Sequence, residues 1–196
     1  MMSHSSTPQM HPIFSEPHWI KIPIGEDWIN QFHSFQNSAF RLEILQAYEE
    51  PSEKNAFEEY QRGNPVSKEF ISSWCDLVSK HVKAGHTMKR VHVVDLPLSN
   101  YLHFEIASAY RHTSRAGENI FLLDKREIST DLAMILSDDF WLLDNQKVMI
   151  QIYSPAGTLQ HSYLSHDPKT IEYYKNIKAR VLELSVPFEE WHEQSI

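Results

Sequence analysis

The sequence predicts an α+β (mixed α/β) domain, with a single mixed β-sheet and helices packed on it. Three observations predict this fold class. Residues 89–124 have the pattern strand, helix, strand, which indicates a parallel βαβ unit with a right-handed crossover. Residues 139–153 hold two apolar segments around the turn formers Asp144 and Asn145, which favours a hairpin in the C-terminal half. After residue 168, apolar side chains recur every three to four positions, as in an amphipathic helix.

The N-terminal part of the 196-residue chain is expected to differ from the rest. Residues 1–37 mix Ser, Pro and His with isolated aromatic side chains, and their prolines break any long helix. We therefore expect residues 1–37 to form a poorly ordered or arm-like segment. Residues 38–192 are expected to form a single α/β domain, which is an ordinary size for one domain.

The first elements of this domain follow from the periodicity of apolar residues. Alternation of apolar and polar side chains predicts a strand over residues 40–48. A short helix is expected between Ser52, a capping residue, and Gly63, a typical C-terminal residue. A longer helix with a single apolar stripe is expected between Pro65 and Gly85.

The later elements are separated by clear turn and capping residues. Buried strands are indicated by runs rich in Val, Ile, Leu and aromatic residues, and helix starts by Ser99 and by Pro168 after Asp167. The expected strands are residues 89–96, 119–124, 139–144, 147–153 and 158–164, and the expected helices start at Ser99 and Pro168.

The charge of the chain limits its partners. The formal net charge is −8, which argues against broad nucleic-acid binding because that needs a basic surface. Residues 80–126 are the one net-positive stretch, with 8 basic and 4 acidic side chains. A local site for a small anionic ligand could lie there. Alternatively, these basic side chains pair with the acidic flanking segments.

The sequence also predicts where the protein is found. There is no run of about 18 apolar residues, so we expect no membrane span. Cys75 is the one cysteine, so no intrachain disulfide can form, and the N-terminus has no apolar secretory segment. We therefore expect a cytoplasmic protein.

Known catalytic and cofactor motifs are missing. The 12 histidines have none of the spacings of metal ligands, and the five glycines form no phosphate-binding loop, so no metal and no cofactor is expected. No Gly-x-Ser-x-Gly nucleophile motif occurs. His81-Val-Lys83 matches the core of a phospholipase D site, but Met88 stands where that motif needs an acidic residue. We interpret this match as chance.

The candidate site consists of charged or polar residues inside apolar runs, where a charge is costly unless paired. These residues are Arg41, Glu43, Arg90, His92, Glu105, Glu118 and Asp139. Two interpretations stay open. In the structural one, Arg41 and Arg90 neutralise Glu105, Glu118 or Asp139 inside the sheet. In the functional one, Arg41, Arg90 and Glu118 line a small anion or peptide pocket at the strand ends, where open α/β sheets bind ligands.

The order of several short blocks resembles a known family. The blocks include Phe40-Arg-Leu-Glu43, Arg90-Val-His-Val-Val94, Ala116-Gly-Glu118, Asp139-Phe-Trp-Leu-Leu-Asp144 and Asp167-Pro168. They resemble the bacterial domain of unknown function numbered 6879, over about residues 40–187. Members of that family are often encoded near helix-turn-helix regulators and small partner proteins. The resemblance therefore implies a regulatory or toxin–antitoxin-like role with a protein partner.

A weaker resemblance concerns the order of elements. The strand at residues 90–94, a helix, the hairpin at 139–153 and a closing helix are similar to one half of a phospholipase D-like domain. In that fold the catalytic His-x-Lys follows the hairpin, and residues 153–163 hold no such motif here. The resemblance thus implies a catalytically silent version of the fold.

Two functional hypotheses follow. The first is a non-enzymatic regulatory or interaction module. The second is a hydrolase or transferase acting on a phosphorylated or nucleotide substrate, in which Arg90 works with His92 or His103 and with Glu118 or Asp139, since acid–base catalysis needs such a pair within reach.

Overall fold

The structure is a computed structural model and describes residues 16–191. Its elements in chain order are β1 (Ile20–Pro23), α1 (Glu26–Ser34), β2 (Ser38–Glu43), α2 (Lys54–Gln61), the 3₁₀ helix η2 (Lys68–Ile71), α3 (Ser72–Lys83), β3 (Thr87–Val94), α4 (Asn100–Ala107), α5 (Ala109–Ala116), β4 (Asn119–Asp124), the 3₁₀ helix η3 (Lys125–Glu127), α6 (Thr130–Ala133), β5 (Asp139–Leu143), β6 (Lys147–Tyr153), β7 (Leu159–Ser165), α7 (Pro168–Leu184) and β8 (Val186–Pro187).

All of these strands belong to one mixed sheet, which confirms the predicted fold class. The strand order is β1-β7-β6-β5-β2-β3-β4-β8. Strands β2, β3 and β4 are parallel to each other, and the neighbouring pairs toward both edges are antiparallel. The parallel centre contains the predicted βαβ unit, and β5 with β6 forms the predicted hairpin.

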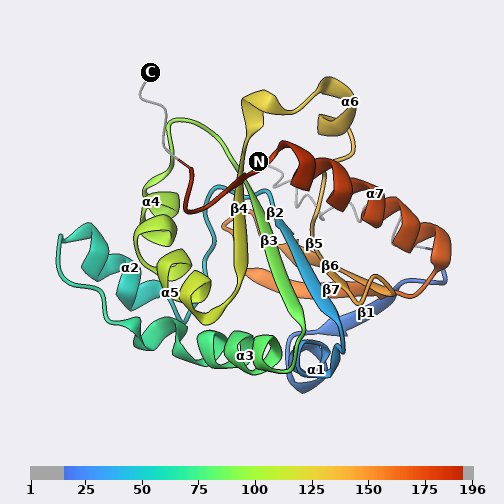
Figure 1. The fold of residues 1–196 in the computed structure, drawn as a ribbon, viewed down its shortest axis with the longest axis horizontal. Coiled ribbons are helices and arrows are strands. Elements are labelled where there is room, and N and C mark those ends of the chain that lie inside the picture. Colours follow the sequence, from blue (N-terminus) through green and yellow to red (C-terminus); the bar gives the residue numbers. More distant parts are fainter. Residues whose placement is uncertain (1–15, 192–196) are drawn as a thin grey trace, which may run out of the picture.

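Helices cover both faces of the sheet (Figure 1). The long helix α7 packs on one face, where Phe140 and Leu42 belong to the same apolar cluster as Ile177 and Val181 of the helix. Helices α1, α3, α4 and α5 cover the other face, over two separate apolar clusters. Between those two clusters the sheet carries charged side chains instead, and this strip is the location of the candidate site.

The βαβ connection is fixed by its two ends. The Ser99 hydroxyl accepts a hydrogen bond from the Leu102 amide at 3.1 Å and so caps α4. The chain turns at Ser108 into α5, which ends at Gly117 with φ of +110°. A Cβ at Gly117 would lie 2.9 Å from a methyl group of Val82, so glycine is needed both for the turn and for the close approach of α3.

The hairpin turn also holds the start of β2. Asp144 and Asn145 both have positive φ, at 54° and 52°, as a type I′ turn requires. The Asp144 carboxylate accepts hydrogen bonds from three consecutive backbone amides, those of residues 36–38, at 2.7–3.1 Å. These bonds hold the pKa of Asp144 below its usual value, although partial burial opposes them.

The start of the domain lies earlier than residue 38 in the structure. Strand β1 pairs with β7, and α1 buries Phe32 against the sheet, while the Trp28 indole donates to the Ser162 hydroxyl at 2.9 Å. Residues 20–34 are therefore an integral part of the sheet and its covering layer rather than a separate arm. The rest of the predicted arm, residues 1–15, lies outside the described residues.

Candidate functional site

Two arginines and one glutamate form the centre of the charged strip. Arg41 on β2 and Arg90 on β3 are direct neighbours in the parallel register. Glu43 lies between their guanidinium groups, 2.9 Å from Arg41 Nε and 2.7 Å from Arg90 Nη1. Burial acts to raise the pKa of Glu43, but the two guanidinium groups outweigh it and bring the pKa to about 2. Glu43 is therefore a carboxylate at any physiological pH.

Two further carboxyl groups complete the pairing of the arginines. Arg90 Nε donates to Glu118 at 3.1 Å, and Arg41 Nη2 lies 4.0 Å from Asp139. Asp139 also accepts hydrogen bonds from the Tyr48 hydroxyl and from a backbone amide. Burial raises the pKa of Asp139 to about 6, despite the opposing effect of Arg41. The arginines thus have ion-pair partners inside the fold, as the structural interpretation expects.

His92 is part of the same cluster but is closed to a ligand. Its side chain is fully buried. One ring nitrogen contacts the Tyr110 hydroxyl, and the other lies 2.8 Å from the Leu45 carbonyl oxygen. Burial lowers the pKa of His92, so the ring is neutral at neutral pH. Both ring nitrogens already have partners, which leaves none for a substrate.

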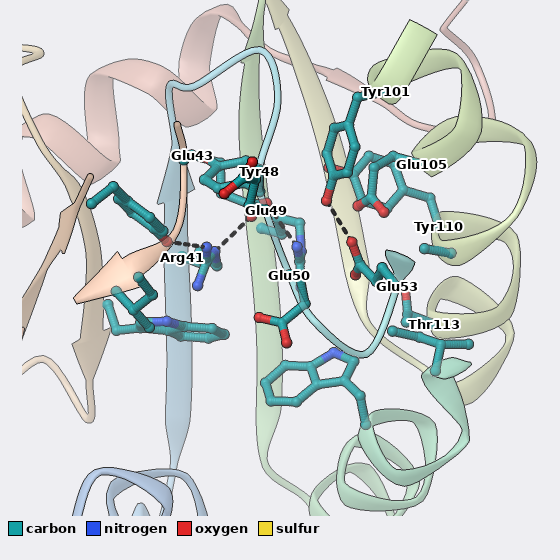
Figure 2. A pocket seen from close by; sticks show the side chains of 18 of the residues that line it. Arg41, Glu43, Tyr48, Glu49, Glu50, Glu53, Tyr101, Glu105, Tyr110 and Thr113 are labelled. Atoms are coloured by element: carbon teal, nitrogen blue, oxygen red, sulfur yellow. Dashed lines mark hydrogen bonds and ion pairs between the residues drawn. The ribbon is translucent and has the colours of Figure 1, made fainter. Parts of the chain in front are cut away.

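A cavity of about 200 Å³ opens above this cluster, between the sheet, α3–α5 and the loop that follows β2. Of the seven predicted site residues, four line it: Arg41, Glu43, Arg90 and Glu105. The other three, His92, Glu118 and Asp139, belong to the cluster without lining the cavity. Figure 2 shows Arg41 on one side of the cavity, Glu53, Glu105 and Tyr110 on the other, and Glu50 between them.

Eight of the 20 residues that line the cavity are aromatic, and they come from helices, from strands and from the loop after β2. The aromatic lining residues are Trp28, Phe32, Tyr48, Trp74, Tyr101, Tyr110, Trp141 and Tyr153. Sequence reasoning did not assign these residues to a site, nor the glutamates of the loop after β2. An aromatic residue on an apolar helix face has the pattern of a core residue, so the sequence offers no way to tell the two roles apart.

Burial raises the pKa of two carboxyl groups at the cavity above the usual value of a glutamate. Burial raises the pKa of Glu53 to about 7, although a hydrogen bond from the Tyr101 hydroxyl at 2.6 Å opposes this. Burial, with the nearby Glu53 and Glu43, raises the pKa of Glu105 well above its usual value. Glu105 is only 5% exposed. A positive charge placed in the cavity would reverse these shifts.

Four residues of the wall have a buried polar atom with no hydrogen-bond partner among the described residues: Arg41, Glu105, Thr113 and Trp141. Arg41 Nε still has an ion-pair contact with Glu43, which leaves three atoms with no polar partner: Glu105 Oε1, Thr113 Oγ1 and the indole nitrogen of Trp141. Most buried polar groups in proteins do have partners, because leaving one unpaired costs about 1–3 kcal/mol. Three such atoms around one small cavity indicate a place for a polar ligand.

A second, wider hollow of about 790 Å³ lies beside the cavity. The loop at residues 48–53 and Tyr101 line both spaces. The far wall of the hollow is α2, with Phe57 and Glu58, and its base is the start of α4. The two spaces therefore lie on either side of one loop and share part of their lining.

The loop between them is held in place by contacts to the sheet. The Gln46 side chain donates to the Val93 carbonyl at 2.8 Å and accepts from the Asp95 amide at 2.7 Å. The Glu49 amide donates to the Gly157 carbonyl at 3.1 Å. A Cβ at Gly157, where φ is +93°, would lie 2.9 Å from the Ala47 carbonyl oxygen. A glycine in the β6–β7 turn therefore permits this close approach of the loop.

The chain belongs to the family described as Domain of unknown function (DUF6879), whose profile matches residues 26–193. The match includes α1, which the expected range of residues 40–187 left out. No curated protein matches the sequence. The family membership agrees with the resemblance stated above and leaves the activity open.

Two solved structures with a phospholipase D-like fold are similar to this chain. NucT from Helicobacter pylori matches with a TM-score of 0.51 and 12% identity, over 86% of this chain and 96% of that one. Nuc from Salmonella typhimurium, a phospholipase D family member, matches with a TM-score of 0.50 and 12% identity, over 86% and 95%. TrmBL2, an archaeal chromatin protein, matches with a TM-score of 0.48 and 12% identity, and this chain spans about half of its length (53%). The likenesses to NucT and Nuc establish the fold, and fold alone does not define an activity.

His81 of the His81-Val-Lys83 match lies in α3 and is enclosed in the fold. Its ring nitrogens contact the Phe32 carbonyl and His86, so His81 is no exposed nucleophile.

Within residues 16–191, no group of three or more His, Cys, Asp or Glu residues has the arrangement of a metal site. In the same part of the chain, no helix has both the length and the apolar character needed to cross a bilayer.

Proposed function

We propose that this protein is a non-enzymatic interaction module of phospholipase D-like fold, which binds a protein partner at the cavity above Arg41 and Arg90. The family resemblance suggests a bacterial regulatory system, in which the partner is a helix-turn-helix regulator or a small protein encoded nearby. We propose a cytoplasmic setting, because the single cysteine excludes an intrachain disulfide.

One observation carries the proposal: three buried polar atoms without partners surround one cavity. Thr113 is 2% exposed, Trp141 3% and Glu105 5%, so water is largely excluded from them in the free protein. A bound group that forms hydrogen bonds to these atoms would recover the cost of leaving them unpaired. In the unbound fold the same atoms lower the stability, because each is buried without a hydrogen bond.

The chemistry of the cluster supports binding over catalysis. Both ring nitrogens of His92 are occupied within the fold, and Glu118 is bonded to Arg90 and Trp74. A hydrolase acting on a phosphorylated substrate would need free cationic groups for the phosphate. Arg41 and Arg90 are instead paired with carboxylates, and five glutamates line the cavity against two arginines. This excess of carboxyl groups disfavours the second hypothesis, a hydrolase or transferase acting on a phosphorylated or nucleotide substrate.

The experiment is purification of the tagged protein from its host, with mass spectrometry of co-eluting proteins. Three forms are compared: the wild type, a Glu105→Gln/Thr113→Val double variant, and Glu172→Gln as a control on the exposed surface of α7. Both cavity substitutions preserve side-chain shape, and removing an unpaired hydroxyl leaves the free fold intact.

A stoichiometric partner that co-elutes with the wild type and control, but not with the cavity variant, is the expected result. A thermal melt of each form verifies folding. The proposal is wrong if no partner co-elutes, or if the folded cavity variant retains the partner as well as the wild type does.

A further inference from the structure

The cavity and the adjoining hollow contain more carboxyl groups than the fold neutralises. Glu49, Glu50, Glu53 and Glu105 line the cavity, and the first three also line the hollow. Their partners in the structure are hydroxyl groups: Thr158 donates to Glu49, Ser52 to Glu50 and Tyr101 to Glu53. Within the described part of the chain, no ion pair joins any of these four glutamates to a lysine, arginine or histidine.

The two arginines of the cavity do not neutralise these four glutamates either. Arg90 is bonded to Glu43 and Glu118, and Arg41 to Glu43, with Asp139 at 4.0 Å. Three carboxyl groups thus serve two guanidinium groups, so the cluster has no positive charge to spare. The four other glutamates face the cavity as an acidic set without a cationic partner, and a cation bound there would favour the ionised form of Glu53 and Glu105, whose pKa values burial raises.

A second observation indicates a ligand at the acidic set. Glu105 is 5% exposed, lines the cavity, and its Oε1 atom has no partner. In Figure 2, Glu105 lies beside Tyr101 and Tyr110, on the same side of the cavity as Glu53. A carboxyl group at this depth costs free energy in either protonation state unless a donor reaches it. A cationic hydrogen-bond donor satisfies both its hydrogen bonding and its charge.

The aromatic wall suits the same kind of ligand. A cation is attracted to the face of Trp or Tyr rings within about 6 Å. The fold already uses this contact twice, since Arg41 lies 5.1 Å from the Trp141 ring centre and Arg90 lies 5.6 Å from that of Tyr110. Trp74 and Tyr101 line the cavity in addition. Aromatic rings combined with unpaired carboxyl groups are complementary to an ammonium or guanidinium group.

The shape of the site extends this inference from a side chain to a peptide. The cavity of about 200 Å³ has room for one side chain, and the adjoining hollow of about 790 Å³ has the volume for neighbouring residues of a peptide. The hollow is acidic too, since Glu49, Glu50, Glu53 and Glu58 line it against Lys54, with Glu58 also paired to Arg62 at 3.2 Å. Phe57 and Pro51 add apolar surface for neighbouring side chains.

We propose that the cavity receives an arginine or lysine side chain of the partner protein, from a basic peptide segment that lies in the acidic hollow between the loop at residues 47–53 and α2. This inference rests on the proposed function, because it assumes that the cavity is the partner-binding site. It assigns Glu53 and Glu105 as the groups that bind the cation, and Glu49, Glu50 and Glu58 as the surface that attracts the segment.

The test uses four libraries of seven-residue peptides with random flanks and a fixed central residue: arginine, lysine, citrulline or glutamate. Citrulline preserves the shape of arginine without its charge. Binding is followed by the fluorescence of the tryptophans that line the cavity, Trp28, Trp74 and Trp141, and by calorimetry. The protein forms are the full-length wild type, Glu53→Gln, Glu105→Gln and the control Glu172→Gln. Free arginine is a further arm, which separates a peptide from a small cation.

The expected result is saturable binding of the arginine or lysine library to the wild type and the control. Binding should be about tenfold weaker or more for citrulline and for either cavity variant, because charge-assisted hydrogen bonds are about twice as strong as neutral ones. The affinity should also fall at higher salt. Free arginine should bind more weakly than the peptides.

Three outcomes would overturn the inference. They are equal binding of the citrulline and arginine libraries, unchanged affinity in the folded Glu53→Gln and Glu105→Gln variants, or no binding of any library. If free arginine binds as tightly as the peptides, the peptide part of the inference is wrong. The proposed function is tested separately by the host partner: its loss from the Glu105→Gln/Thr113→Val variant upholds that proposal even if no library shows a preference for positive charge.

Discussion

Replacing Glu43 by glutamine should lower the free energy of unfolding by about 3 kcal/mol at pH 7. Two independent estimates give this value. The fall in the pKa of Glu43, from 4.5 to about 2, corresponds to about 3 kcal/mol of favourable interaction between the carboxylate and the folded protein. Removing one partner of a buried ion pair costs about 3–5 kcal/mol in other proteins. The two estimates agree because one carboxylate serves both Arg41 and Arg90.

The dependence on pH gives this prediction a second, independent check. The pKa of Glu43 is lower in the folded state than in the unfolded state, so its ionisation stabilises the fold fully above about pH 4.5. This stabilisation is lost as the pH falls from there toward 2. Urea unfolding of the wild type and of Glu43→Gln should therefore differ by about 3 kcal/mol at pH 7, and by roughly half of that or less at pH 3.

The matched control is Glu172→Gln, which removes an exposed glutamate paired with Lys175 three residues along α7. Its urea midpoint should equal that of the wild type, since exposed pairs contribute little. A cost below about 1 kcal/mol for Glu43→Gln at pH 7 would refute the reasoning. So would a cost that stays constant between pH 7 and pH 3, because it would show that the charge of Glu43 is not what stabilises the cluster.

Three further predictions concern the cavity and the core. Glu53→Gln should stabilise the fold at pH 8 by at most about 3 kcal/mol, and should have little effect at pH 5. The reason is that the pKa of Glu53 is raised from 4.5 to about 7, so the wild type loses stability as the pH rises through this range and the glutamine variant does not. Urea unfolding at both pH values measures this, and a variant no more stable than the wild type at pH 8 would contradict it. Gly157→Ala should lower the melting temperature more than Gly85→Ala. Both glycines have positive φ, but a Cβ at Gly157 would collide with the Ala47 carbonyl oxygen, whereas a Cβ at Gly85 would meet no atom within 4 Å. Equal losses of melting temperature would show that the close approach of the loop is unimportant. Phe140→Ala should cost about 3–5 kcal/mol in urea unfolding, since this side chain is 1% exposed at the centre of the α7 face, and a cost below 1 kcal/mol would mean that the packing differs from the structure.

The central elements could be predicted because their local patterns agree with their final environment. Residues 119–124 form β4 with the predicted bounds, and Pro168 begins α7 after the capping residue Asp167. The strand expected over residues 40–48 ends instead at Glu43, since the Ile44 amide donates to Asp139 and the chain leaves the sheet there. That bond joins residues 95 positions apart, so nothing in the local sequence indicates it.

The edge strands were missed for a related reason. Strand β1 has four residues and ends at Pro23, and β8 has two residues. Strands this short depend on pairing with β7 and β4 rather than on their own periodicity. Sequence periodicity therefore identifies the interior of this sheet better than its edges.

The seven candidate residues were found because a charged or polar residue in an apolar run is conspicuous, whereas the residues that complete the cavity have ordinary patterns. Glu53 belongs to a surface-like run of polar residues, and Trp74 belongs to an apolar helix stripe. Each becomes part of a site only when the loop after β2 folds back over the sheet, as the contacts of Gln46 and Gly157 require. Long-range placement of a loop is the information that a single sequence does not contain.

The structural and the functional interpretation of the two arginines are compatible, and together they change the expected charge of the ligand. Considered alone, Arg41 and Arg90 suggested a site for an anion. Because Glu43, Glu118 and Asp139 pair with them inside the sheet, the two arginines leave no positive charge at the base of the cavity. The groups that then face the open space are Glu49, Glu50, Glu53 and Glu105. A ligand recognised by charge at this site must accordingly be cationic, and a peptide that carries a single arginine is the smallest probe that tests both the sign of the charge and the role of the adjoining hollow.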